Sequence, residues 1–262
     1  LSGNDARRAT WINPPMRLDR FIGSRLACSA RTAQHMIAAR EVLLNGVPAT
    51  DGSQAVSTFC RVEAAGRVLR AREPVYLMLH KPRGCVSATT DCRHPTVLDL
   101  IDLPGRDELH LAGRLDFNTT GLLLLSNDGS WTRRITLPER KIPKTYLVRT
   151  RDPITPEYAE RFAAGIHFRY ENLVTQPAQL VILSATRAEL TIHEGRYHQV
   201  RRMFGFFRNE VVALHRLAVG GIVLDAALAP GGWRHLAPAE IAAADALDAP
   251  GVSDGRIRRE SP

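Results

Sequence analysis

Short apolar runs separated by turn-forming residues fill the chain from residue 76 to about residue 240, and this pattern limits the possible folds most strongly. Runs of three to five mostly apolar residues lie at 75–79, 146–148, 180–183, 189–192 and 221–224. Runs of this length favour strands over helices. Segments of helical character are few, at 155–164 and 197–206. The alternation predicts an α+β fold with a mainly antiparallel sheet.

A small basic module precedes this region. Apolar residues recur at helical spacing within residues 18–26, and Ser29 is a suitable N-cap for a second helix. Residues 42–47 then form a strand that enters an Asn45-Gly46 turn, which is a strong hairpin signal. The module holds nine arginines and five acidic residues. We expect it to fold as a small α/β domain.

The chain therefore divides into four parts. A charged stretch, residues 67–74, links the module to the larger region, and the last twenty or so residues have the composition of a fraying tail. The predicted parts are an N-terminal extension (1–16), the module with its linker (17–75), a catalytic domain (76–240) and a C-terminal tail (241–262).

Composition narrows the kind of partner. Of the 262 residues, 44% are hydrophobic, so the chain can bury a core, and its formal net charge is +8. A positive balance favours a polyanionic partner such as nucleic acid. Only three of the basic residues are lysines. The arginine excess reflects either genome composition or selection for RNA phosphate, which guanidinium groups grip in two places.

No metal or disulfide framework is expected. The four cysteines are far apart and form no Cys-x-x-Cys pair, which favours free thiols in a reducing cytoplasm. His193 and His198 flank an acidic residue, but they are five residues apart and Gly195 interrupts them, so they would not share a helix face. The sequence has no membrane-length apolar stretch and no signal peptide. We expect a cytoplasmic protein without a membrane partner.

One stretch, residues 110–131 (HLAGRLDFNTTGLLLLSNDGSW), combines structural and chemical signals. It predicts a hairpin, with a strand at 110–115, a turn, and a buried strand at 122–125. Asp116 and Asn118 suit such a turn because their short side chains bond the local backbone. On spacing alone, Asp116 is either a turn residue or a catalytic acid.

Further segments decide between these two interpretations. They are 112–129 (AGRLDFNTTGLLLLSNDG), 144–148 (KTYLV), 194–204 (EGRYHQVRRMF), and 220–224 (GGIVL) with 228–231 (LAPG). In this order and spacing they resemble the motifs of pseudouridine synthases that modify ribosomal RNA at single positions. Residues 17–56 are similar to the alpha-L RNA-binding motif. The second and third segments look most like enzymes acting on small-subunit (16S) RNA, because large-subunit relatives usually differ at Tyr197 and His198.

The resemblance implies a catalytic constellation. The reaction breaks the bond between ribose and N1 of uracil and rejoins the base through C5. Asp116 would be the catalytic carboxylate, either as a nucleophile or by removing a sugar proton. Arg201 would hold Asp116 ionised and oriented. Tyr146 would stack on the uracil, with its hydroxyl where the C5 proton leaves.

The resemblance also implies binding residues. Val200 would pack on the other face of the base, and Arg114 would fill the space that the extracted uridine leaves or hold the displaced backbone. Arg202 is a candidate phosphate contact. The module would bind structured RNA through four arginines, Arg17, Arg20, Arg31 and Arg40.

Three positions depart from the family pattern. His80 stands where asparagine is common, and Arg40 and Arg208 stand where glycine is common. We expect these substitutions to change local turns without touching the proposed chemistry.

No cofactor is expected, because the sequence contains neither a phosphate-binding loop nor a dinucleotide fingerprint. The expected partner is ribosomal RNA, in a partly assembled small-subunit particle, bound by a monomer. Three alternatives remain: a synthase aimed at large-subunit RNA, an RNA-binding assembly factor that has lost catalysis, and a glycoside hydrolase. The last would need a second carboxylate across a sugar, and no motif supplies one.

Overall fold

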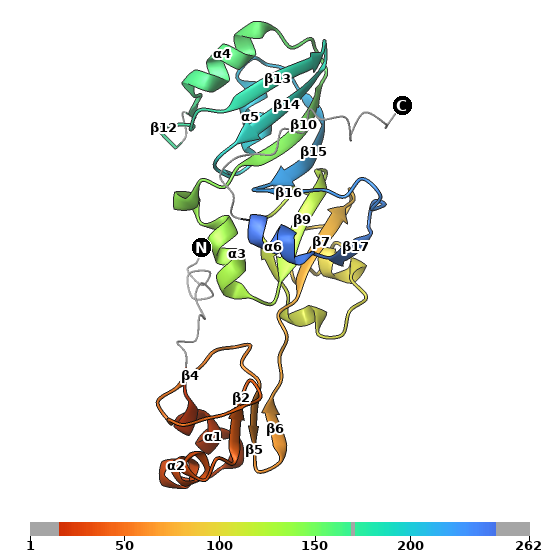
Figure 1. Ribbon diagram of the computed structural model, residues 1–262. Helices are drawn as coiled ribbons and strands as arrows, with labels where there is room; N and C mark the ends of the chain where they lie inside the picture. The colour runs from red at the N-terminus through yellow and green to blue at the C-terminus, as the bar shows by residue number, and fades with distance from the viewer. Residues whose placement is uncertain (1–15, 169–170, 245–262) are drawn as a thin grey trace. The chain divides into compact units, whose positions relative to one another are not determined.

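The computed structural model describes residues 16–168 and 171–244. They divide into two compact units between Pro74 and Val75 (Figure 1). The predicted extension lies outside the described residues except for its last residue, Met16. Residues 245–262 of the predicted tail also lie outside them.

Within its described residues, 16–74, the small unit contains two helices and two short sheets. Its elements are β1 (Met16–Arg17), α1 (Leu18–Leu26), α2 (Ala30–Ala38), β2 (Val42–Leu44), β3 (Val47–Pro48), β4 (Ala55–Val56), β5 (Val62–Ala64) and β6 (Arg67–Arg70). β1 pairs with β4, and the other strands follow the order β3-β2-β5-β6. Apolar residues from both helices and from β2, β4 and β5 form one core.

Two sequence predictions for this unit are confirmed. The Ser29 hydroxyl caps α2 by accepting a hydrogen bond from the Thr32 backbone N–H at 3.1 Å. Asn45 and Gly46 form the β2–β3 turn with φ values of 54° and 80°. These left-handed values are the ones that a tight hairpin turn with the strand's twist requires.

The predicted linker is wrong in its first half. Arg67–Arg70 forms β6, which pairs antiparallel with β5. Leu69 packs against the core of the small unit, and the Arg70 guanidinium lies 4.3 Å from the centre of the Phe21 ring. Arginine stems cover apolar surface while the charged head stays near water, so a charged stretch can be a strand.

The larger unit begins with β7 (Tyr76–Lys81) and is built on one nine-stranded sheet. Its other strands are β8 (His110–Ala112), β9 (Thr120–Ser126), β10 (Lys144–Thr150), β13 (Gln179–Ser184), β14 (Arg187–Ile192), β15 (Val211–Val219), β16 (Ile222–Val223) and β17 (Trp233–His235). A separate pair is formed by β11 (His167–Phe168) and β12 (Leu173–Val174). The helices are α3 (Gly129–Thr136), α4 (Pro156–Ala164), α5 (Gln199–Gly205) and α6 (Pro238–Ala243), with short 3₁₀ turns at Val97–Leu100, Arg106–Glu108 and Pro138–Arg140.

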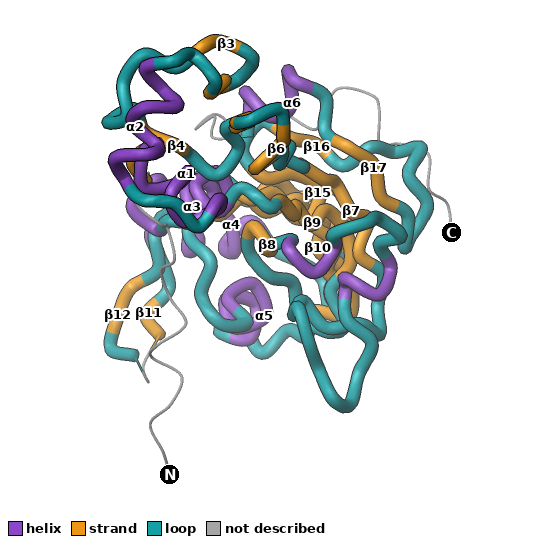
Figure 2. The backbone as a smooth tube through the Cα atoms, turned by 90° about the horizontal axis from the view of Figure 1, so that it is seen from below, coloured by secondary structure: helices purple, strands orange, loops and turns teal. Residues whose placement is uncertain are grey.

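The sheet follows the order β13-β14-β10-β15-β9-β7-β17, with β8 on β9 and β16 on β15. Within it, every described pairing is antiparallel except that of β9 with β15, which is parallel and joins only two residue pairs. Figure 2 shows β15, β9 and β7 side by side. The α+β prediction with a mainly antiparallel sheet is confirmed, and the short parallel seam divides the sheet into two antiparallel halves.

The four leucines of β9 are buried on both faces of the sheet. Leu122 and Leu124 contribute to a cluster with Trp131, whereas Leu123 and Leu125 belong to a cluster on the other side with the 3₁₀ turn at Val97–Leu100. Successive residues of a strand point to opposite faces, so a continuous apolar run indicates a strand covered on both sides. The predicted hairpin is confirmed, because β8 pairs antiparallel with β9.

Two helices were not predicted. α3 begins where the Asp128 carboxylate accepts hydrogen bonds from the backbone N–H groups of Ser130 and Trp131. α6 extends the larger unit to Ala244, which is buried, so the predicted tail at 241–262 begins too early. Both helices are one to two turns long, and burial against neighbours stabilises such short helices more than their own propensity does.

Gly121 sits on the parallel seam with φ of 107°, and a Cβ there would overlap the backbone N and O atoms of Arg216. We expect Gly121→Ala to lower the free energy of unfolding of the larger unit by about 3 kcal/mol or more, because backbone overlap adds to left-handed strain. Denaturant unfolding of the full chain measures the change.

Gly84→Ala is the matched control. Gly84 also has a left-handed φ, of 83°, but a Cβ there meets no atom within 4 Å. It should cost only about 1–2 kcal/mol, the strain of the left-handed conformation alone. Equal losses for the two variants would show that close approach at the seam is unimportant.

Candidate active site

A cavity of about 500 Å³ lies where the β9–β15 seam meets α5. Its lining includes all five residues of the larger unit that the sequence assigns to the reacting uridine, namely Arg114, Asp116, Tyr146, Val200 and Arg201. A second cavity of about 480 Å³ shares Asp116, Arg201 and His198 with the first. Segments that are far apart in sequence are therefore brought together around one carboxylate.

Asp116 lies in the loop between β8 and β9, and its main chain is tightly held. Its carbonyl accepts a hydrogen bond from the Thr119 N–H at 3.0 Å, which closes the predicted turn. On the other side of the loop, the Ser87 hydroxyl bonds both the N–H and the carbonyl of Leu115. The loop is therefore fixed before and after Asp116.

Lys81 fixes the same loop from inside. Its side chain is fully buried, and its Nζ donates to the carbonyls of Pro82, Asp116 and Thr119 at 3.0, 3.1 and 3.0 Å. Burial lowers the pKa of Lys81, and the nearby Asp116 opposes that shift. Charged donors make the stronger hydrogen bonds, so this ammonium group acts as a clamp on the loop.

The Asp116 carboxylate faces His198 rather than the predicted arginine. His198 Nε2 lies 3.6 Å from Asp116 Oδ1, and His198 has a left-handed φ of 50° directly before α5. The prediction that Arg201 pairs with Asp116 is not met in this structure. Among the described residues, the Arg201 guanidinium donates instead to the Val211 carbonyl at 2.7 Å.

Tyr146 and Val200 supply the apolar walls of the cavity. Tyr146 belongs to β10 and Val200 to the first turn of α5, and both are buried in the same hydrophobic cluster. Strand register places Tyr146 directly opposite Arg216 of β15. Residues opposite each other in a sheet share a face, so the ring and the guanidinium line the cavity together.

Arg216 and Lys144 give the cavity a cationic floor that the sequence did not reveal. Arg216 is 2% exposed; Nε donates to the Leu122 carbonyl at 2.7 Å, and Nη2 has no partner among the described residues. Burial, with Arg216 close by, lowers the pKa of Lys144 to about 8. Lys144 and Tyr146 are two apart on one strand, and that spacing was the available signal.

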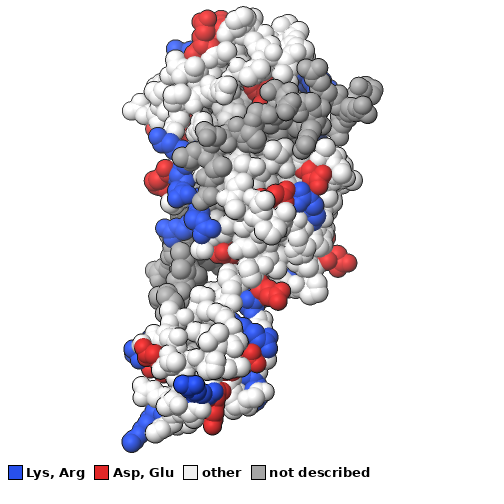
Figure 3. All heavy atoms as spheres, in the orientation of Figure 1, with Lys and Arg blue, Asp and Glu red and all other residues white. Residues whose placement is uncertain are grey.

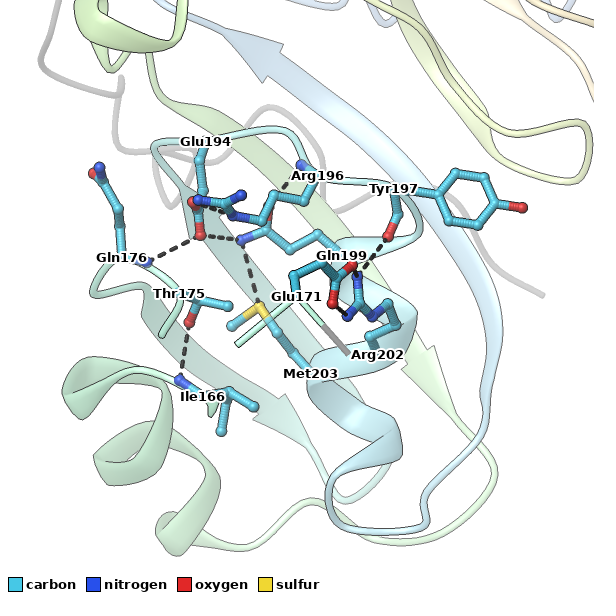
Figure 4. A network of polar contacts seen from close by, with 10 residues as sticks. All are labelled: Ile166, Glu171, Thr175, Gln176, Glu194, Arg196, Tyr197, Gln199, Arg202 and Met203. Carbon is cyan, nitrogen blue, oxygen red and sulfur yellow. Dashed lines mark hydrogen bonds and ion pairs between the residues drawn. The ribbon is translucent and has the colours of Figure 1, made fainter. Parts of the chain in front are cut away.

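Arg202 is not brought to the cavity. Its guanidinium pairs with the Glu171 carboxylate at 2.7 Å and lies 3.7 Å from the centre of the Phe168 ring. The predicted phosphate contact is therefore engaged elsewhere on the surface of this unit. Figure 4 shows the pair next to the polar network that holds the segment before α5.

The four arginines predicted to bind RNA belong to the small unit, and all four are exposed. Arg17 differs from the others because it pairs with Asp19 at 2.7 Å, and this pair lowers the pKa of Asp19 to about 2. On the larger unit, basic side chains gather over α3 and the turn after it (Figure 3). The exposed basic residues there are Arg133, Arg134, Arg140 and Lys141.

Two other kinds of site have no support within residues 16–168 and 171–244. No three His, Cys, Asp or Glu side chains of this part lie together as metal ligands would. Its helices are all too short or too polar to cross a bilayer.

Comparison with known proteins finds relatives over most of the chain. The family described as RNA pseudouridylate synthase matches residues 75–205, and the S4 domain family matches residues 16–59. The ribosomal small subunit pseudouridine synthase A of Pseudomonas aeruginosa is 54% identical over 227 residues, which cover 86% of this chain and 99% of that protein. The Escherichia coli protein of the same name is 45% identical, with coverage of 87% and 99%. A crystal structure of a pseudouridylate synthase is 42% identical, with a TM-score of 0.64 and coverage of 87% and 99%.

The clamp formed by Lys81 can be tested directly. We expect Lys81→Met to lower the free energy of unfolding by about 2–3 kcal/mol, since buried carbonyls of the Asp116 loop lose a charged donor. The amide of Thr119, which bonds the Asp116 carbonyl, should exchange faster with solvent. Lys141→Met is the control, because the Lys141 side chain is exposed. Unchanged exchange at Thr119 in Lys81→Met would contradict the clamp.

Proposed function

This chain belongs to the RNA pseudouridylate synthase family, and we propose that it converts one uridine of small-subunit ribosomal RNA to pseudouridine in the cavity around Asp116. The observation that carries the proposal is the meeting of Asp116 and Tyr146 in one cavity from opposite sides of the parallel seam. The relatives with full-length similarity are small-subunit enzymes by name, which favours this substrate over large-subunit RNA.

The reaction balances without any co-reactant. The C1′–N1 bond of the uridine breaks, the base turns, C1′ bonds to C5, and the C5 proton leaves while N1 gains one. Asp116 would act on the sugar, and its position between two cavities leaves room for a ribose and the RNA backbone. A uridine must leave its stack to reach such a site, since the glycosidic bond is otherwise shielded.

The other side chains would divide the remaining work. Tyr146 and Val200 would hold the uracil between an aromatic ring and an aliphatic group, and the Tyr146 hydroxyl would take the C5 proton. Arg201 would turn from the Val211 carbonyl to the Asp116 carboxylate when RNA enters and excludes water, because ion pairs strengthen in a dry site. Arg114, exposed at the cavity rim, would support the displaced RNA strand.

We also propose that the small unit anchors the substrate. Residues 16–59 match the S4 domain, and Arg20, Arg31 and Arg40 expose their charge on it. The protein would act as a monomer in the cytoplasm, on a partly assembled particle in which the target uridine is still reachable. Binding of this kind is dominated by phosphate contacts and therefore weakens with salt.

Carbodiimide mapping of pseudouridines tests the function. Unmodified small-subunit and large-subunit RNAs, each naked and in assembly particles, are incubated with the protein and scanned by reverse transcription. A single new stop in small-subunit material is expected. A stop only in large-subunit RNA would show that small-subunit RNA is not the substrate. Tight RNA binding without any stop would contradict the catalytic function.

We expect Asp116→Asn to reduce turnover by at least about a thousandfold, because an amide can serve neither as a nucleophile nor as a base on the sugar. RNA affinity should change little, since the substitution preserves shape and most binding interactions. Single-turnover mapping and filter binding give the two values. Asp102→Asn, an exposed aspartate of the same unit, is the control. Substantial turnover by the Asp116→Asn variant would contradict the role of Asp116 as the catalytic carboxylate.

The anchoring role predicts a change in salt dependence. The triple variant Arg20→Gln, Arg31→Gln and Arg40→Gln should lower the slope of log Kd against log salt by about 2–3, roughly one for each phosphate that is no longer neutralised. Turnover at saturating RNA should be nearly unchanged. Arg61→Gln is the control, since Arg61 is exposed but pairs with Glu63. An unaltered slope in the triple variant would remove the assigned role.

A further inference from the structure

Tyr197 carries one of the most exposed aromatic rings of the described chain, and it lies at the mouth of the cavity that holds Asp116. Tyr197 is 75% exposed, yet it belongs to the lining of that cavity. In Figure 4 the ring points away from the polar network of its own segment. A large ring held in water at a cavity mouth presents an unused stacking face.

The ring is held by a second ring. Tyr197 stacks on His198, with the ring centres 3.9 Å apart and the planes 15° from parallel. His198 in turn lies 3.6 Å from the Asp116 carboxylate. The two rings form a continuous stack that starts at the proposed catalytic carboxylate and ends in solvent, so one face of Tyr197 is occupied and the other is open.

The segment that carries Tyr197 is fixed by buried polar contacts, shown in Figure 4. The Glu194 carboxylate is 7% exposed and accepts from the Gln176 N–H, Gln199 Nε2 and Arg196 Nε at 2.9, 2.7 and 2.9 Å. The Gln199 side-chain oxygen accepts from the Arg196 N–H at 3.0 Å. These bonds hold the main chain on both sides of Tyr197, so the ring needs little ordering to bind a ligand.

We propose that the Tyr197–His198 stack is a platform for the nucleobase next to the target uridine. The inference rests on the proposed function, because it takes its ligand from the same RNA strand. Extraction of a uridine removes a stacking partner from its neighbour. The open face of Tyr197, which stacks on the His198 ring beside Asp116, replaces that partner. Any base can stack there, because every base has a π-face.

Other exposed rings nearby fit this role less well. Phe117 also lines the cavity and is 39% exposed, but it meets His94 edge-on, at an interplanar angle of 67°. Phe206, at the far end of α5, is 48% exposed and is absent from the cavity lining. Its ring lies under the Arg161 guanidinium at 5.1 Å. Phe206 therefore serves as a control residue.

The test is a double-mutant cycle between the protein and the RNA. A small-subunit RNA fragment that wild-type protein modifies is prepared with an abasic site immediately 5′ or 3′ of the target uridine. Each RNA is measured with the wild-type chain, Tyr197→Ala, Tyr197→Phe and Phe206→Ala, giving Kd and the single-turnover rate at saturating protein. Tyr197 is exposed, so its substitution leaves the core intact.

We expect Tyr197→Ala to weaken binding of the intact RNA by about 5- to 150-fold, which corresponds to about 1–3 kcal/mol for one stacked base. The rate at saturation should fall by a smaller factor. Tyr197→Phe should restore most of the affinity, and Phe206→Ala should match wild type. On RNA that lacks the stacking neighbour, wild type and Tyr197→Ala should bind equally.

Three outcomes would overturn the platform while leaving the proposed function in place. The first is unchanged affinity of Tyr197→Ala for an RNA that the protein modifies. The second is that the free-energy losses of Tyr197→Ala and of each abasic site add when the two changes are combined. The third is a loss confined to the saturated rate, which would make Tyr197 a positioning residue for His198. If wild-type protein forms no pseudouridine on any small-subunit RNA, the proposed function fails, and the platform fails with it.

Discussion

The approach of the Gly121 backbone to the backbone of Arg216 is the contact on which the catalytic unit depends. It joins two antiparallel half-sheets through a parallel seam of only two residue pairs. So short a ladder leaves buried carbonyls that need other donors. Side chains supply them: Arg216 Nε donates to the Leu122 carbonyl at 2.7 Å, and the Thr120 hydroxyl donates to the Leu214 carbonyl at 3.5 Å. The same hydroxyl lies 2.8 Å from His215 Nδ1, and burial lowers the pKa of His215 to about 4, so that the ring stays neutral. One of these donors, Arg216, also lines the cavity.

Near the seam, two cationic side chains are buried and bond main-chain carbonyls in place of carboxylates. The described bonds of Lys81 and Arg216 go to main-chain carbonyls, several of them in the loop that carries Asp116. A buried charge is costly unless hydrogen bonds satisfy it. Carbonyl dipoles meet that need while leaving the positive charge uncancelled, so the cavity keeps a cationic floor. Lys81 therefore fixes the geometry of the loop, and Arg216, which lines the cavity together with Lys144, supplies positive charge to the site.

Local patterns allowed much of the fold to be predicted, because each has a local physical cause. The run of leucines in β9, the Ser29 cap and the Asn45-Gly46 turn are examples. Arg40 and Arg208 differ from expectation: both have left-handed φ, 60° and 58°, which is the backbone conformation that glycine favours, whereas we expected these substitutions to change the local turns. What the sequence could not reveal depends on tertiary packing. Such features are the short helices α3 and α6, strand β6, and the position of Arg216 opposite Tyr146 in the cavity lining.

The side chain that faces Asp116 is an example of a feature that depends on tertiary packing. His198 stands directly before α5, and Arg201 lies in the first turn of that helix. Both line the cavities beside Asp116, so the carboxylate has two basic side chains close by, and side-chain geometry decides which of them it faces. The left-handed conformation of His198 brings its ring to the carboxylate, while the Val211 carbonyl holds Arg201. An exposed imidazole is the weaker partner, because solvent screens it and only its protonated form is charged. A ligand that displaces water from the cavity therefore favours the exchange of histidine for arginine, and the same two residues can serve the empty and the occupied site.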